Sequence, residues 1–150
     1  MSLCEDLYRD IILDHYQHPR GKGTLPAPTH REERLNPVCG DEVVMELDVR
    51  EGKVCEARFS GHGCSISQAS ASMLTELIAG QPMDQVRELI EKFKTRMTTR
   101  GDLGECPCEL GDVEALDGVR KYPVRIKCAL LAWNTLQRAM LEGEIDGKAS

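Results

Sequence analysis

The feature that most constrains the fold is a change of hydrophobic period in the middle of the chain. Apolar residues alternate with more polar ones over residues 43–49, and a second alternating run covers residues 55–59. Successive side chains of a strand point to opposite faces, so each run predicts a strand with one buried face, and the second run places Cys55 on that face. The turn at residues 50–53 offers Gly52 for a positive φ. The two strands should therefore form an antiparallel hairpin.

Helical periodicity flanks this hairpin on both sides. The run of alanine and serine at residues 69–72 predicts that another element packs closely on its helix, which Ser65 or Ser67 can cap. Pro123, a favoured first-turn residue, begins a last helix that is apolar on most sides and should be central. The prediction for residues 1–150 is a single α+β domain, a small antiparallel sheet with helices packed on one face. The predicted helices cover residues 3–18, 65–79, 83–97 and 123–142 with a short helical turn at 113–116, and the predicted loops cover residues 20–35 and 98–111.

The composition argues against several classes of function. The 150 residues are 41% hydrophobic and 29% charged, which is typical of a soluble globular domain. The formal net charge is −6 and the basic residues are dispersed, so nucleic acid, which needs a basic face, is not an expected partner. No signal or membrane-spanning run is recognisable, so we expect a cytoplasmic protein with no membrane partner. There the seven cysteines should be reduced.

Three cysteines and one aspartate form a candidate metal site: Cys39, Asp41, Cys64 and Cys128. Each lies where a strand or a turn meets the start of a helix. Gly40 allows a sharp bend, so the side chains of Cys39 and Asp41 can turn toward one ion. A site of three sulfurs and one oxygen differs from the closed four-thiolate cage of a structural zinc. Because the oxygen is the weak ligand, such a site should exchange its contents.

Each of these residues also has a plainer interpretation, and their spacing matches no zinc finger. Asp41 could cap backbone amides in a turn, and Cys64 and Cys128 could be small buried side chains of the core. In favour of function, Cys64 follows a Gly-x-Gly bend and precedes a helix start, where the helix dipole favours a thiolate. Arg125 and Lys127 place positive charge near Cys128, which lowers the pKa of a thiol.

The other candidate side chains carry weaker signals. His62 lies in the bend before Cys64 and could support a metal ligand, or it could be a solvated turn residue. Cys55 is interpreted as core packing. Cys106 and Cys108 share one loop, where idle thiols are favoured over a labile disulfide or an accessory metal contact. No function is assigned to the remaining cysteine, on the first helix.

Three motifs together resemble the iron–sulfur cluster assembly scaffold family, the group of IscU, SufU and the NifU N-terminal domain. They are Asn-Pro-Val-Cys-Gly-Asp at residues 36–41, the glycine- and serine-rich run at residues 61–72 and Pro-Val-Arg-Ile-Lys-Cys at residues 123–128. The likeness covers about residues 3–142. Within the family the chain is similar to the SufU branch, because Lys127 stands where the IscU branch has a histidine. A longer segment before the last helix, ending at Leu116, also agrees with that branch.

This resemblance implies that the four candidate ligands bind the metal and that the partner is a pyridoxal-phosphate cysteine desulfurase. It implies a zinc-containing acceptor of persulfide sulfur, a sulfurtransferase-like partner of the desulfurase that serves downstream assembly proteins. The alternative is a scaffold that assembles and transfers a [2Fe–2S] cluster on the same ligands, with iron in place of zinc. Arg125, Lys127 and His62 are the candidate supporting or partner-contact residues. A merely structural zinc module is disfavoured by the oxygen in the donor set.

Cys39 is the expected sulfur-accepting thiol. A nucleophile that attacks the outer sulfur of a persulfide must be accessible and deprotonated. Cys39 falls on a predicted loop, whereas Cys64 is fixed at a helix start and Cys128 lies on a central helix. Cys128 remains the rival candidate, because the positive charge of Arg125 favours its thiolate.

Overall fold

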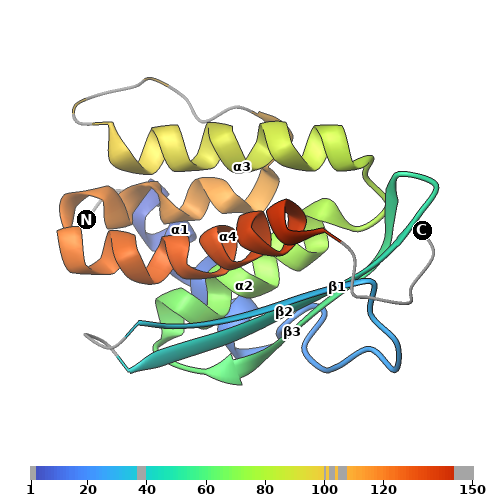
Figure 1. Ribbon diagram of the computed structural model, residues 1–150. Helices are drawn as coiled ribbons and strands as arrows, with labels where there is room; N and C mark the ends of the chain where they lie inside the picture. Colours follow the sequence, from blue (N-terminus) through green and yellow to red (C-terminus); the bar gives the residue numbers. More distant parts are fainter. Residues whose placement is uncertain (1–2, 37–39, 100, 102–103, 105–107, 144–150) are drawn as a thin grey trace.

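The computed structural model describes residues 3–36, 40–99, 101, 104 and 108–143, and the side chains of residues 3–6 and 108 are not described. A three-stranded antiparallel sheet lies on one side and the helices stack over one of its faces (Figure 1). The strands are β1 (His30–Asn36), β2 (Asp41–Arg50) and β3 (Lys53–His62), in the order β1-β2-β3. The predicted α+β architecture is confirmed.

The core side of the sheet follows the predicted alternation. Met45 and Leu47 of β2 and Phe59 of β3 are fully buried. The hairpin turns at Gly52, whose φ is 75°. Both strands extend beyond the predicted ranges, because main-chain pairing continues from Arg50–Lys53 at the turn to Glu42–His62 at the far end. This extension carries the end of β3 toward the candidate ligands.

Strand β1 (His30–Asn36) takes up the end of the predicted loop at residues 20–35, so the loop prediction was wrong from residue 30 onward. The strand pairs with β2 from His30–Leu47 to Asn36–Asp41. Its sequence, His-Arg-Glu-Glu-Arg-Leu-Asn, is almost wholly polar, and most of its side chains are exposed or half-buried. Main-chain hydrogen bonds to β2 hold this edge strand in place. Because its side chains are nearly all polar, the sequence shows no alternation that would have predicted it.

Cys55 is exposed, which corrects its interpretation as a core residue. Val49 pairs with Val54 and Asp48 pairs with Glu56, so Cys55 is the extra residue of a β-bulge. A bulge of one residue reverses the alternation of a strand. Val54 on one side of the bulge and residues beyond it are therefore buried, and the thiol faces solvent.

Helices α2 (Ser65–Ile78) and α4 (Pro123–Glu142) contact the sheet, and α3 (Met83–Thr98) lies on their far side (Figure 1). Helix α1 (Leu3–Gln17) packs on α2 and on the 3-10 helix η1 (Cys108–Lys121). The short turn and the loop predicted for residues 98–116 were wrong in extent, since η1 covers fourteen residues. It is kinked at Gly111, where φ is 55°, and this break hides its helical period from the sequence.

Another element packs closely on the small residues of α2, as predicted, and the structure shows that this element is α4. Ser70 is fully buried; its hydroxyl donates to the carbonyl oxygen of Ala129 over 2.6 Å and accepts from the indole nitrogen of Trp133 over 2.9 Å. The ring of Trp133 stacks on Phe93 of α3 with a centroid distance of 4.1 Å. One serine thus sets the spacing of the two central helices, and one tryptophan joins them to α3.

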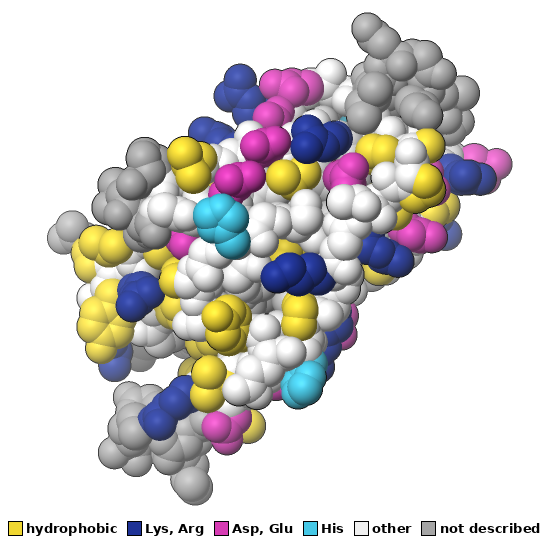
Figure 2. Space-filling view, turned by 90° about the horizontal axis from the view of Figure 1, so that it is seen from below, with side chains coloured by type: hydrophobic (Ala, Val, Ile, Leu, Met, Phe, Trp, Pro, Cys, Tyr) yellow, Lys and Arg dark blue, Asp and Glu magenta, His cyan; other side chains and the backbone are white. Residues whose placement is uncertain are grey.

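Helices of the described part of the chain fall short of the length and apolarity that crossing a membrane requires. On the face drawn in Figure 2, acidic and basic side chains are interspersed.

We predict that Ser70→Ala lowers the free energy of unfolding by about 1–3 kcal/mol, because the buried indole N–H of Trp133 loses its acceptor. Denaturant unfolding measures the change, and Ser60→Ala, a change at a half-buried serine of β3, is the control. Ser70→Ala combined with Trp133→Phe should cost less than the sum of the single changes. Equal effects of Ser70→Ala and Ser60→Ala would contradict this role.

Candidate metal centre

The structure brings together three of the four candidate ligands. Asp41 is the first residue of β2, Cys64 directly precedes α2, and Cys128 lies in the second turn of α4. One carboxylate oxygen and the two sulfurs all lie within 4.8 Å of one another. Cys39, the fourth candidate, lies outside the described residues. These three side chains come from a strand and two helices that are far apart in sequence.

Asp41 is held rigidly, because it is fully buried and hydrogen-bonded. The backbone N–H of Cys64 donates to its Oδ1 over 2.8 Å, and the Cys64 thiol lies 3.7 Å from its Oδ2. The plainer interpretation of Asp41, a side chain that accepts from a backbone amide, is therefore correct for one of its oxygens. The other oxygen faces the thiol and can serve a metal.

Cys64 itself is the N-cap of α2, where Ser65 or Ser67 was predicted. Its sulfur accepts from the backbone N–H of Ser67 over 3.5 Å, and the hydroxyl of Ser67 donates to the carbonyl oxygen of Cys64 over 3.1 Å. A backbone N–H donor and the positive end of the helix dipole both favour the thiolate form. The sulfur is therefore placed in an electrostatic environment that suits a metal ligand.

Gly63 is required by the close approach of the chain to these ligands. A Cβ atom on Gly63 would lie 2.4 Å from Oδ1 of Asp41 and 2.5 Å from the hydroxyl oxygen of Ser67. Gly61 has a φ of 113°, and a Cβ there would lie 2.2 Å from the carbonyl oxygen of Glu42. The two glycines of the Gly-His-Gly-Cys run thus allow the end of β3 to press against Asp41.

Cys128 is buried, with 1% of its surface exposed. Its thiol donates to the carbonyl oxygen of Val124, one helical turn earlier, over 3.5 Å. The side chain is therefore fixed by a regular helix rather than by a loop. Its burial agrees with a metal ligand and also with the core cysteine that the sequence left open.

The three candidate supporting residues lie at the surface. His62 is 74% exposed, and its Nε2 lies 3.6 Å from Oε2 of Glu42. Lys127 lines a cavity of about 210 Å³ together with Leu35 at the end of β1. Arg125 is exposed in the first turn of α4. The hydrogen bonds and ion pairs among the described residues do not join any of the three to Asp41 or Cys64, and their roles as supporting or partner-contact residues stay predictions.

The remaining thiols lie away from this centre or outside the description. Cys55 is exposed in the bulge of β3. Cys106 lies outside the described residues, as do the side chains of Cys4 and Cys108. The predictions for those three thiols stay predictions.

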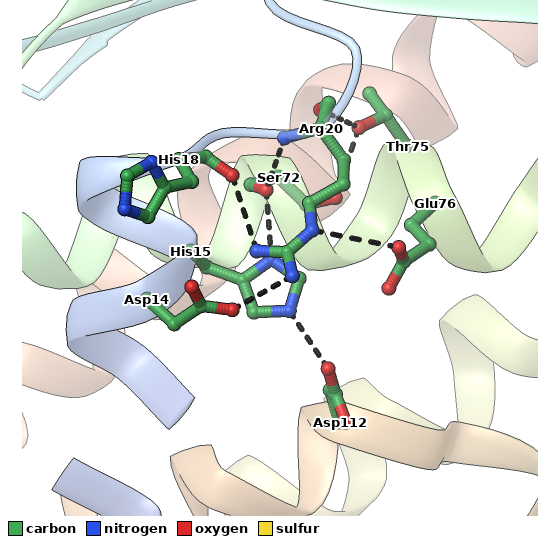
Figure 3. A network of polar contacts seen from close by, with 8 residues as sticks. All are labelled: Asp14, His15, His18, Arg20, Ser72, Thr75, Glu76 and Asp112. Atoms are coloured by element: carbon green, nitrogen blue, oxygen red, sulfur yellow. Dashed lines mark hydrogen bonds and ion pairs between the residues drawn. The ribbon is translucent and has the colours of Figure 1, made fainter. Parts of the chain in front are cut away.

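A second cluster of possible ligands, missed by the sequence reasoning, joins α1, α2 and η1 (Figure 3). One atom each of His15, Glu76 and Asp112 lies within 4.8 Å of the others. His15 is fully buried, and its Nδ1 is 2.7 Å from the hydroxyl of Ser72 while its Nε2 is 2.9 Å from Oδ2 of Asp112. Both ring nitrogens are thus already engaged. Arg20 adds a cation, with its Nε 3.6 Å from Oε2 of Glu76.

These contacts make the second cluster a structural clamp. The guanidinium of Arg20 also donates to Asp14 over 2.7 Å, and this hydrogen bond lowers the pKa of Asp14 below its ordinary value. The backbone N–H of Arg20 donates to the hydroxyl of Ser72 over 2.8 Å, which fixes the chain just after α1. A guanidinium among the carboxylates disfavours a metal ion, because it already supplies the positive charge. No local sequence pattern signals this network, since its members come from three distant segments, residues 14–20, α2 and η1.

The cluster of Asp41, Cys64 and Cys128 therefore defines a class of protein. It is an α+β protein in which a buried carboxylate and thiols gather where one strand and two helices meet. Sulfur donors with one oxygen suit zinc and iron better than magnesium or calcium. The three described ligands could bind such a metal.

The chain belongs to the family of the NifU-like N-terminal domain, whose model matches residues 7–129. It is 40% identical over 140 residues to the zinc-dependent sulfurtransferase SufU of Bacillus subtilis, covering 93% of each chain. It is 38% identical to the iron–sulfur cluster assembly scaffold protein IscU of Thermotoga maritima, over 89% of this chain and 92% of the relative. The resemblance to the iron–sulfur cluster assembly family is thus confirmed.

A solved structure agrees with this assignment. A protein of Fervidobacterium islandicum, described as an iron–sulfur cluster assembly scaffold protein for the SUF system, superposes with a TM-score of 0.77 at 32% identity. The match covers 87% of this chain and 94% of the other. The fold and the family therefore agree across nearly the whole length of the chain.

We predict that Gly63→Ala weakens zinc binding by roughly tenfold or more, because the added methyl group overlaps both Asp41 and Ser67 and forces Asp41 and Cys64 out of position together. Gly118→Ala is the matched control, since a Cβ on Gly118 would meet nothing within 4 Å. Competition with a chromogenic chelator measures both affinities. Unchanged zinc affinity in correctly folded Gly63→Ala would show that this close approach does not position the metal ligands.

Proposed function

We propose that this protein accepts persulfide sulfur from a cysteine desulfurase and supplies it to iron–sulfur cluster assembly. The observation that carries the proposal is the meeting of Asp41, Cys64 and Cys128 in a chain that is 40% identical to a zinc-dependent sulfurtransferase. The donor set fits zinc, which Cys39, Asp41, Cys64 and Cys128 would hold. When bound, zinc keeps thiols deprotonated at neutral pH without redox chemistry of its own.

The residues of the chain supply the accepting group. The thiolate of Cys39 attacks the outer sulfur of the persulfide on the desulfurase. A new sulfur–sulfur bond to Cys39 forms, the sulfur–sulfur bond within the donor breaks, and the desulfurase cysteine leaves as a thiolate. The proton of the persulfide stays on the transferred sulfur, so no oxidant or reductant is needed.

The other residues of the site support this transfer. Asp41 and Cys128 are buried, and Cys64 is tied to Asp41 by its backbone N–H, so these three are suited to remain in place. Arg125, exposed in the first turn of α4, is suited to contact the desulfurase or to stabilise the departing thiolate. Lys127 and His62, also exposed, offer further contacts on the rim of the same site.

The location of the transferred sulfur tests the proposal. After brief reaction with a cysteine desulfurase and cysteine, mass spectrometry of peptides should find the added sulfur on Cys39. Cys39→Ser should accept no sulfur, whereas Cys55→Ser, which removes an exposed thiol at the opposite end of β3 from Cys64, should accept it at the normal rate. Sulfur found on Cys128, with normal acceptance by Cys39→Ser, would make Cys128 the acceptor.

A second candidate function is a scaffold that builds and transfers a [2Fe–2S] cluster on the same ligands. The relative from Thermotoga maritima, at 38% identity, carries the name of such a scaffold. Thiolates suit iron as well as zinc. Anaerobic purification from the native host decides between the two: zinc in a colourless protein supports the acceptor, and iron with sulfide and a visible absorption spectrum supports the scaffold.

We predict that Asp41→Ala slows metal exchange or retains an assembled cluster, because the weakly binding oxygen is lost from a site of soft sulfur ligands. Release to a chelator, followed in time, measures exchange. Asp48→Ala in the same strand is the control, since Asp48 is partly exposed and pairs with Arg50. Faster loss of all metal than in the unchanged protein, with no cluster retained, would contradict the prediction.

A further inference from the structure

A small polar cavity lies beside the candidate metal centre and contains none of its ligands. It has a volume of about 160 Å³ and is lined by Tyr16, Pro19, Lys22, His62, Gly63 and Gln68. These residues come from the end of α1, the segment after it, the end of β3 and the first turn of α2. Tyr16 and His62 are exposed, so the cavity opens to solvent.

Gln68 supplies the most informative observation. Only 5% of its surface is exposed, and its amide nitrogen, Nε2, is buried without a hydrogen-bond partner. Its other amide atom, Oε1, accepts from the ammonium group of Lys22 over 3.4 Å. Because an ammonium group can only donate, this contact fixes which amide atom is the oxygen. A buried N–H donor without an acceptor is rare and unfavourable, so the site lacks an acceptor.

Lys22 provides a positive charge in a fixed position. Its neighbours bond to β3: the N–H of Gly23 donates to the carbonyl oxygen of Phe59 over 2.8 Å, and the N–H of Phe59 donates to that of Gly21 over 2.9 Å. The ammonium group lies 6.0 Å from the centre of the Phe59 ring. Gly21 has a φ of 75°, and a Cβ there would lie 2.8 Å from Oγ1 of Thr75. The main chain on both sides of Lys22 is therefore held against β3 and α2.

The charges around the cavity favour an anion. None of the six described lining residues is acidic. Two carboxylates lie next to lining residues, and both have partners: Oε2 of Glu42 lies 3.6 Å from Nε2 of His62, and Oδ1 of Asp41, close to Gly63, accepts from the N–H of Cys64. The donors that remain are the ammonium of Lys22, the amide N–H of Gln68 and the hydroxyl of Tyr16. Apart from Oε1 of Gln68, which accepts from Lys22, the described contacts of these lining side chains supply no acceptor for the donors.

We propose that this cavity binds a small oxyanion, either a carboxylate or a phosphate. The anion would accept from Lys22 and, after a small movement of the buried amide, from Gln68. The volume excludes a nucleotide and suits a group of a few heavy atoms. No proposed metal ligand lines the cavity, and the two side chains proposed to bind the anion, Lys22 and Gln68, have no part in the proposed sulfur transfer; His62 borders both sites.

The test is an NMR titration of the full chain, labelled with ¹⁵N. Inorganic phosphate and acetate are added in separate experiments at constant ionic strength with chloride, which removes general screening effects. The side-chain NH₂ signals of Gln68, assigned by their loss in Gln68→Glu, should shift and saturate. Saturation by phosphate alone assigns the site to phosphate groups, and saturation by acetate assigns it to carboxylates.

Two variants test whether Lys22 and Gln68 bind the anion, and two controls make the same charge changes elsewhere in the protein. Lys22→Met removes the charge and keeps the apolar stem, and it should weaken binding by roughly tenfold or more. Gln68→Glu places a carboxylate in the site and should abolish binding. Lys53→Met, at the opposite end of β3, and Gln85→Glu, on α3, make the same charge changes elsewhere and should leave the affinity unchanged.

Three results would overturn the proposal. The first is a linear drift of the Gln68 signals that chloride reproduces. The second is equal affinity in Lys22→Met and in the unchanged protein. The third is a set of shifts centred on Asp41, Cys64 and Cys128 with Gln68 unaffected, which would place the anion on a bound metal. The measurement needs neither a desulfurase nor sulfur transfer, so its failure and the failure of the proposed function are distinguishable.

Discussion

The hydroxyl of Ser70 is the contact on which the geometry of the site depends. It links α2 to α4 by donating to Ala129 and accepting from Trp133, in a region where both partners are buried. Cys128 directly precedes Ala129, and Cys64 lies six residues before Ser70. A larger residue at position 70 would push the helices apart and separate the two sulfurs. The dry core of the protein therefore determines the distance between ligands that belong to different helices.

The carboxylate of Asp41 joins the sheet to this helix pair. A buried charge is tolerated only where donors or counter-ions stabilise it. Here the N–H of Cys64 provides one donor, and the thiol of the same residue faces the second oxygen. A bound cation would stabilise the remaining charge of the carboxylate and of the thiolates. The candidate metal centre thus gathers buried groups that are unfavourable without a cation, and this is the chemistry expected of a metal site.

The sequence predicted the parts of this structure that leave a local periodic signal. The strand alternation around Met45, the helix start at Pro123 and the close-packed small residues near Ser70 all follow from rules that act within a few residues. It did not predict β1, because the side chains of that edge strand are polar and only backbone pairing with β2 forms it. It misplaced Cys55, because a single-residue bulge reverses an alternation without changing composition.

The site shows the same division between local and distant information. The meeting of Asp41, Cys64 and Cys128 was expected from three motifs that the family resemblance connected, since their spacing alone did not decide it. The clamp around His15 and the cavity beside Gln68 had no such guide. Their decisive contacts join residues that are more than 40 positions apart, such as His15 with Ser72 at a separation of 57 and Lys22 with Gln68 at 46. Only the folded chain brings them together, and in both cases the evidence is the pairing of buried polar atoms. In the clamp both nitrogens of the buried imidazole are satisfied, so it holds structure; in the cavity one buried donor is not, so it points to a ligand.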